Sequence, residues 1–125
     1  MLLAIDAGNS NIVIGVFEDN ELVSNWRIAT DRYKLEDEYG MLIRGLLANE
    51  MVEYTKISGV IISSVVPDIS SVLVKMVNRS FGISPVVVSG ADDRIGIEIR
   101  YGKPAEVGSD RLVNSVGAYE QYGGP

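Results

Sequence analysis

The residues best suited to chemistry lie near the start of the chain, where an apolar run ends in a carboxylate and a polar turn. The turn reads Asp6-Ala7-Gly8-Asn9-Ser10-Asn11, and a second apolar run follows it. Gly8 can take a positive φ, and Asn9 and Asn11 tolerate one, so the composition predicts a hairpin turn at this point. Backbone N–H groups and the Ser10 hydroxyl would bind a phosphate, and the Asp6 carboxylate would bind a metal ion. The turn therefore indicates a nucleotide triphosphate site, and the alternative is an ordinary hairpin with a polar turn.

A second candidate group lies on a helix predicted near the other end of the chain. Asp110, Asn114 and Gly117 recur at i, i+4 and i+7, so they share one helix face, while apolar side chains form another. Gly108 and Ser109 fall in the first turn, where the backbone N–H groups have no intrahelical partner and a ligand can approach closely. A polar ligand lying along this helix would find a carboxylate, an amide and open space.

Two charged residues begin that helix. The helix macrodipole favours the ionised form of Asp110, and Arg111 beside it would neutralise developing phosphate charge or pair with a carboxylate. The alternative is that Asp110 is an ordinary acidic residue of a first turn and Arg111 a surface cation.

The composition narrows the function classes. The chain has 125 residues with a net charge of −6, enough for one core, and it lacks the basic excess typical of nucleic-acid binders. It contains no Cys and no His, which excludes disulfides and thiolate nucleophiles and leaves carboxylates for proton transfer. No apolar stretch reaches the roughly 18 residues of a membrane span, and the N-terminus does not read as a signal peptide. We therefore expect a cytoplasmic protein that binds neither nucleic acid nor membrane.

The predicted elements place both groups on an α/β fold. Helix periodicity, β-branched runs and turn residues predict the order βββ-α-β-α-β-α, a mixed sheet flanked by helices. Asp68 is the expected N-cap of the second helix. The predicted strands span residues 2–6, 12–18, 21–30, 57–66 and 85–88, and the predicted helices span 36–51, 69–81 and 104–122. This order matches one ribonuclease-H-like lobe of the actin-type and sugar-kinase-type ATPases.

The motifs together resemble the type III pantothenate kinases of the acetate and sugar kinase/Hsp70/actin superfamily. The likeness rests on the opening turn, on Ile-Ile-Ser-Ser-Val-Val-Pro at 61–67, and on the block at 101–114. The family pattern of that block is Tyr-Asp-Asn-Pro-x-Glu-Val-Gly-Ala-Asp-Arg-x-x-Asn. The chain departs from it at Gly102-Lys103, where the pattern has Asp-Asn, and at Ser109, where it has Ala. The residues that match are Tyr101, Pro104, Glu106, Val107, Gly108, Asp110, Arg111 and Asn114.

The resemblance implies an ATP-dependent phosphorylation of pantothenate to 4'-phosphopantothenate, the first step of coenzyme A biosynthesis, with Asp110 as general base. Asp6 would also lie near Mg²⁺. The residues implied in ATP binding are Asp6, Ala7, Gly8, Asn9, Ser10, Asn11, Ile12 and Val13. Those implied in pantothenate binding are Tyr101, Gly108, Ser109, Asp110 and Arg111. The 61–67 block, by contrast, is expected to be core strand and turn.

The resemblance also implies partners. Residues 1–125 would form the first lobe, and a second lobe with a motif for K⁺ or NH₄⁺ would follow, so we expect this piece alone to be inactive. The full protein would be a homodimer. Two alternatives stay open: an actin-like ATPase or kinase with another acceptor, and a non-catalytic accessory or regulatory relative.

Overall fold

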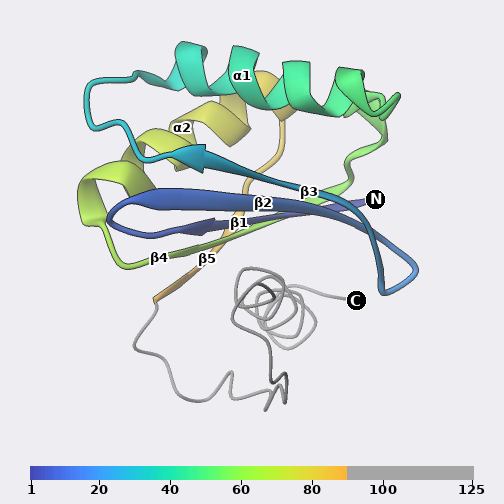
Figure 1. Ribbon diagram of the computed structural model, residues 1–125, viewed down its shortest axis with the longest axis horizontal. Coiled ribbons are helices and arrows are strands. Elements are labelled where there is room, and N and C mark those ends of the chain that lie inside the picture. The colour runs from blue at the N-terminus through green and yellow to red at the C-terminus, as the bar shows by residue number, and fades with distance from the viewer. Residues whose placement is uncertain (90–125) are drawn as a thin grey trace.

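The computed structural model describes residues 1–89, which fold into a five-stranded mixed sheet with both helices on one face (Figure 1). The strand order across the sheet is β3-β2-β1-β4-β5. The strands are β1 (Leu2–Ala7), β2 (Asn11–Glu18), β3 (Glu21–Ala29), β4 (Gly59–Ser64) and β5 (Val86–Ser89). The helices are α1 (Glu36–Asn49), the short 3₁₀ helix η1 (Tyr54–Lys56) and α2 (Pro67–Phe81). The predicted order is confirmed through β5, and the predicted helix at 104–122 lies outside the described residues.

The first three strands form two antiparallel hairpins, and the later strands pair in parallel. The β2–β3 turn places Asp19 at φ 52° and Asn20 at φ 68°, the left-handed angles that let a two-residue turn follow the twist of a hairpin. α1 with η1 connects β3 to β4, and α2 connects β4 to β5. The carboxyl ends of β1, β3, β4 and β5 therefore meet at one edge of the sheet (Figure 1).

The main core lies between the sheet and the two helices. Alternation along β1 directs Leu3, Ile5 and Ala7 toward the helices, where they join one buried cluster with side chains of α1 and α2. Ala4 belongs to a second, smaller cluster with Phe17 and Ile61 on the opposite face. Leu3, Ala4 and Ile5 are all fully buried, as expected for a central strand. No helix within residues 1–89 is long and apolar enough to cross a membrane.

The sequence-based boundaries need correction at three elements. α1 ends at Asn49 rather than 51, because Met51 takes a φ of 60° that a right-handed helix cannot contain. α2 begins at Pro67, with Val66 as the N-cap, so the prediction that Asp68 is the N-cap was wrong. β4 is two residues shorter at each end than the predicted strand at 57–66, because η1 and the α2 N-cap take its flanks. The remaining boundaries agree with the prediction or differ by one residue.

Candidate functional site

The Asp6 side chain lies on the face of the sheet opposite the helices, at the carboxyl end of the central strand β1. This follows from alternation, because Ile5 and Ala7 on either side belong to the helix-facing core. The register places Asp6 opposite Val13 on β2 and opposite Ser63 on β4. Only 7% of Asp6 is exposed. Its position at the carboxyl end of the central strand, next to the β1–β2 loop, makes Asp6 a candidate for function.

The β1–β2 loop next to Asp6 forms the predicted hairpin. The Gly8 N–H donates to the Asn11 carbonyl oxygen at 2.9 Å, which closes the loop. Within residues 1–89, positive φ occurs only at Asp19, Asn20, Met51 and Gly82, so this turn does not use the positive φ that its glycine and asparagines allow.

Thr30, the residue just after β3, holds the β1–β2 loop in place through two hydrogen bonds. Its backbone N–H donates to the Ser10 carbonyl oxygen at 2.9 Å, and its hydroxyl donates to the Gly8 carbonyl oxygen at 2.8 Å. Within the described part of the chain, the backbone N–H groups of Asn9 and Ser10 donate to no protein acceptor. Thr30 therefore occupies the Gly8 and Ser10 carbonyl oxygens, and the loop presents spare N–H donors, as an anion-binding loop requires.

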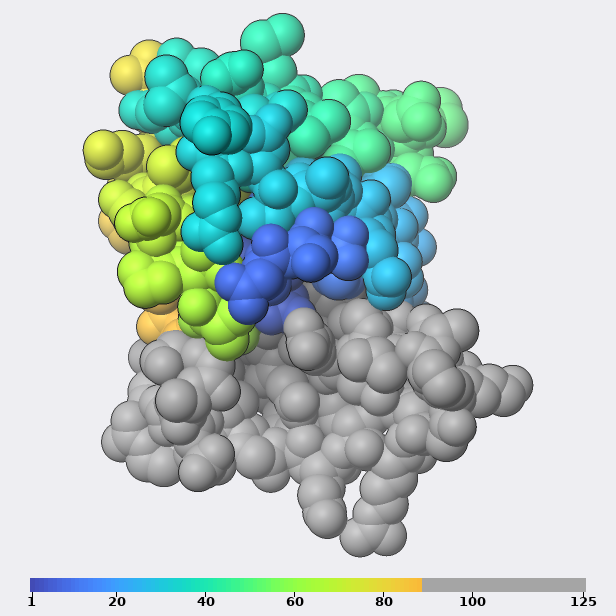
Figure 2. Space-filling model, turned by 60° about the vertical axis from the view of Figure 1, so that its left-hand side comes forward, coloured from blue at the N-terminus to red at the C-terminus, as the bar shows by residue number. Residues whose placement is uncertain are grey.

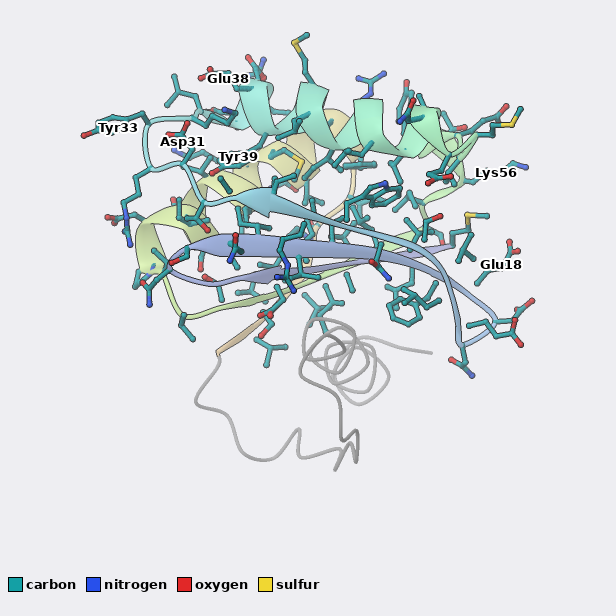
Figure 3. The ribbon with its side chains drawn as sticks, viewed as in Figure 1. Glu18, Asp31, Tyr33, Glu38, Tyr39 and Lys56 are labelled. Atoms are coloured by element: carbon teal, nitrogen blue, oxygen red, sulfur yellow. The ribbon has the colours of Figure 1, made fainter. Side chains whose placement is uncertain are left out.

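The segment after Thr30 is anchored in turn by α1. The Tyr39 hydroxyl accepts a hydrogen bond from the Asp31 N–H at 3.0 Å and donates one to the Asp31 carbonyl oxygen at 2.7 Å. Tyr39 is fully buried, so the anchor is part of the core. Figure 3 shows Tyr39 reaching from α1 toward Asp31 at this edge.

The Asp31 side chain organises the same turn. Its carboxylate accepts the Tyr33 N–H at 2.8 Å and lies 3.4 Å from the Lys34 Nζ. The Tyr33 N–H is the main cause that holds the pKa of Asp31 below its usual value, and Lys34 adds to the effect. Asp31 thus acts within its own loop.

The next residue, Arg32, contacts the hairpin loop directly. One of its guanidinium nitrogens, Nη2, donates to the Asn9 side-chain oxygen at 3.4 Å. Figure 2 faces this edge: the blue hairpin borders the cyan segment after β3 and the yellow-green start of α2. Sequence reasoning missed Thr30 and Arg32; the signal available was that the predicted β3 strand ends at residue 30 on the same edge as Asp6.

The block at 61–67 behaves as core strand and turn, as expected. Ile61 and Ile62 are fully buried. The Ser64 hydroxyl accepts the Val66 N–H at 3.0 Å and donates to the Val66 carbonyl oxygen at 3.1 Å, which shapes the entry to α2. Ser63, one residue earlier, is half-buried beside Asp6 and makes no hydrogen bond through its hydroxyl within residues 1–89.

The other predicted site residues lie outside the described residues: Tyr101, Gly108, Ser109, Asp110 and Arg111. Their roles stay predictions. Among residues 1–89 no group of three or more His, Cys, Asp or Glu side chains could hold a metal ion. A single carboxylate such as Asp6 still fits Mg²⁺, which commonly binds through one or two carboxylates together with phosphates and water.

A separate hollow lies at the carboxyl end of α1. Its volume is about 890 Å³, and its lining includes Arg44, Met51 and Tyr54. The Arg44 guanidinium stacks 3.8 Å from the centre of the Tyr54 ring. No residue singled out by its chemistry lines this hollow, so we place the candidate site at the β1–β2 loop.

Comparison with known proteins decides the family. The family model of the type III pantothenate kinases matches residues 2–125. The chain belongs to this family. A type III pantothenate kinase from Moorella thermoacetica is 47% identical over 125 residues, and one from Bacillus cytotoxicus is 48% identical over the same length. All of this chain aligns with them, whereas 49% and 47% of the relatives are covered, so the chain spans about half their length.

The fold has a counterpart among solved structures. A candidate N-acetylglucosamine kinase from Porphyromonas gingivalis superposes with a TM-score of 0.53 at 13% sequence identity. The likeness covers 71% of this chain and 34% of the other. At this identity it shows the fold alone, and it confirms the predicted α/β fold of the sugar-kinase type.

Proposed function

We propose that the full-length protein transfers the γ-phosphoryl group of ATP to pantothenate and forms 4'-phosphopantothenate, the first step of coenzyme A biosynthesis. The observation that carries the proposal is the β1–β2 loop of a type III pantothenate kinase family member: Asn9 and Ser10 present backbone N–H groups without protein acceptors, directly after the buried carboxylate of Asp6. Neutral donors held in place by Thr30 suit a phosphate group that gains charge during transfer.

ATP and Mg²⁺ would bind at this loop. Ala7, Gly8 and Asn11 to Val13 continue the loop into its two strands, so the whole segment 6–13 would line the triphosphate. Mg²⁺, when bound, would spread the phosphate charge, and Asp6 would be the carboxylate that holds it. A monovalent cation, K⁺ or NH₄⁺, is the third expected cofactor, and it would bind in the second lobe.

The acceptor side of the reaction rests on the family pattern at 101–114. Tyr101 and Gly108 to Arg111 would bind pantothenate, and Asp110 would accept the proton of its terminal hydroxyl. Residues 1–125 would form the first lobe of a cytoplasmic homodimeric enzyme, and the 125-residue piece alone would be inactive because the second lobe completes the nucleotide cleft.

The decisive experiment measures pantothenate-dependent ADP release by the full-length gene product, with Asp110→Asn beside it. We expect release by the wild type and a loss on the order of 10²–10⁴-fold in the variant, because a general base contributes about that much. Pantothenate affinity should stay within about tenfold, because the amide keeps the size of the side chain. ADP release that does not depend on pantothenate would point to another acceptor, and no release with Mg²⁺ and K⁺ present would point to an accessory relative.

A further inference from the structure

We propose that Arg32 binds a phosphate group of the nucleotide and supplies the positive charge that the β1–β2 loop itself lacks. This inference rests on the proposed function, because it names a residue of the same site. Nothing in the sequence pattern singled out Arg32; its assignment comes from its contact with Asn9.

The first step is position. β3 runs antiparallel to β2 and ends at Ala29, so Thr30, Asp31 and Arg32 leave the sheet beside the β1–β2 loop. Thr30 and Asp31 are held by hydrogen bonds to the loop and to the buried Tyr39. Arg32 therefore starts from a fixed backbone, and its guanidinium group reaches the loop at Asn9.

The second step is availability. A guanidinium group has five N–H donors, and within residues 1–89 Arg32 uses one of them, in a long bond of 3.4 Å to an amide oxygen of Asn9. No carboxylate of the described chain pairs with Arg32, whereas Lys34 pairs with Asp31 and Arg79 pairs with Asp37. Arg32 is exposed, so its charge stays available to a ligand.

The third step is charge. The chain carries a net charge of −6, and the loop offers only neutral donors from Asn9 and Ser10. A triphosphate needs positive charge close by, and arginine matches phosphate oxygens with two parallel N–H···O bonds, which lysine cannot do. The weak bond to Asn9 holds the guanidinium over the loop and is easily exchanged for a phosphate oxygen.

The test uses three variants of the full-length gene product. Arg32→Gln removes the charge, whereas Arg32→Lys keeps the charge but cannot make two parallel N–H···O bonds to a phosphate. As a control, Lys56→Gln removes one charge at the opposite end of the sheet (Figure 3). ADP release is measured against MgATP concentration at saturating pantothenate, and against pantothenate at saturating MgATP. The midpoint of thermal unfolding of each variant shows whether it is folded.

We expect Arg32→Gln to lower kcat/KM for MgATP by about 10- to 100-fold, the usual value of a charged hydrogen bond, with the KM for pantothenate unchanged. Arg32→Lys should recover part of the loss, and Lys56→Gln should match the wild type. A kcat/KM for MgATP in Arg32→Gln within threefold of that of an active wild type would overturn the proposal. An equal loss of kcat/KM in Lys56→Gln would overturn it as well.

A direct titration separates this inference from the proposed function. If the wild type releases no ADP with pantothenate, the proposed function fails, and calorimetric titration of MgATP into each variant still tests Arg32. Weaker MgATP binding by Arg32→Gln, with Lys56→Gln unchanged, supports the assignment. Equal binding by the wild type and Arg32→Gln, or no binding by any of them, overturns it.

Discussion

The hydroxyl of Tyr39 holds both backbone polar groups of Asp31, accepting from its N–H at 3.0 Å and donating to its carbonyl oxygen at 2.7 Å. Tyr39 belongs to α1 and to the main core, whereas Asp31 belongs to the loop that carries Thr30 and Arg32. The packing of a helix is thereby connected to the backbone of the candidate phosphate loop.

Replacing Tyr39 with Phe should lower the free energy of unfolding by about 1–3 kcal/mol, because the Asp31 N–H loses its partner and the Asp31 carbonyl oxygen keeps only the Lys34 N–H at 3.4 Å, while the ring stays packed. Urea unfolding of the full-length gene product measures the change. Tyr33→Phe is the matched control, since Tyr33 is 93% exposed and its hydroxyl makes no contact within residues 1–89. An equal loss in both variants would show that the Tyr39 hydroxyl is not the anchor.

Thr30→Val should weaken the use of MgATP by about 3- to 10-fold in kcat/KM. Valine keeps the shape of Thr30 and its backbone N–H but loses the hydroxyl that donates to Gly8, a bond worth about 0.5–1.5 kcal/mol. Thr30→Ser keeps that donor and should stay near the wild type. Steady-state ADP release checks both; identical values for the two variants would mean that the hydroxyl does not position the loop.

Asp6→Asn should raise the Mg²⁺ concentration needed for ATP use, and added Mg²⁺ should restore part of the activity. The amide keeps the shape of this side chain, which is only 7% exposed, so the fold should persist. Activity of the wild type and the variant is measured against Mg²⁺ concentration at fixed ATP. A loss that no Mg²⁺ concentration relieves would assign Asp6 to support of the hairpin.

Lowering the pH should reduce the stabilisation of the fold that Asp31 provides. Its folded pKa lies below the usual 3.8, mainly because of the Tyr33 N–H, so the ionised form stabilises the fold above pH 3.8. That contribution is lost as the pH falls through the folded pKa. Asp31→Asn should therefore be less stable than the wild type at pH 7, with the difference shrinking below pH 3.8. Thermal unfolding of both proteins across the pH range measures the difference in stability. A difference that does not change with pH would exclude the charge of Asp31 as its source.

The two glycines of α1 should respond oppositely to added side chains. A Cβ at Gly40 would overlap the Ser80 side chain of α2, whereas nothing lies within 4 Å of a Cβ at Gly45. Gly45→Ala should stabilise the protein by about 0.5–1 kcal/mol through helix propensity. Gly40→Val should destabilise it by about 1–3 kcal/mol through overpacking. Denaturant unfolding of the two variants gives the sign of each change in the free energy of unfolding. Stabilisation by both substitutions would mean that α1 and α2 separate easily.

The sequence predicted what depends on local pattern. β-branched runs and turn residues located every strand through β5, and the spacing of Tyr39, Ile43 and Leu47 located α1. The contacts of Thr30 with Gly8 and of Arg32 with Asn9 join residues about twenty positions apart, and they depend on which strand ends share an edge. Composition also suggested positive φ at Gly8, but tertiary hydrogen bonds from Thr30 shape that loop instead.

The pairing of β1 with β4 has a consequence for how the protein tolerates change. Side chains on a strand alternate between faces with a period of two, so a slip of β1 by one residue in its pairing with β2 and β4 would exchange the faces of Ile5 and Asp6. The carboxylate would then enter the apolar layer beneath the helices, and an isoleucine would take its place beside Ser63. The register of β1 is thus as important to the candidate site as the identity of Asp6 itself.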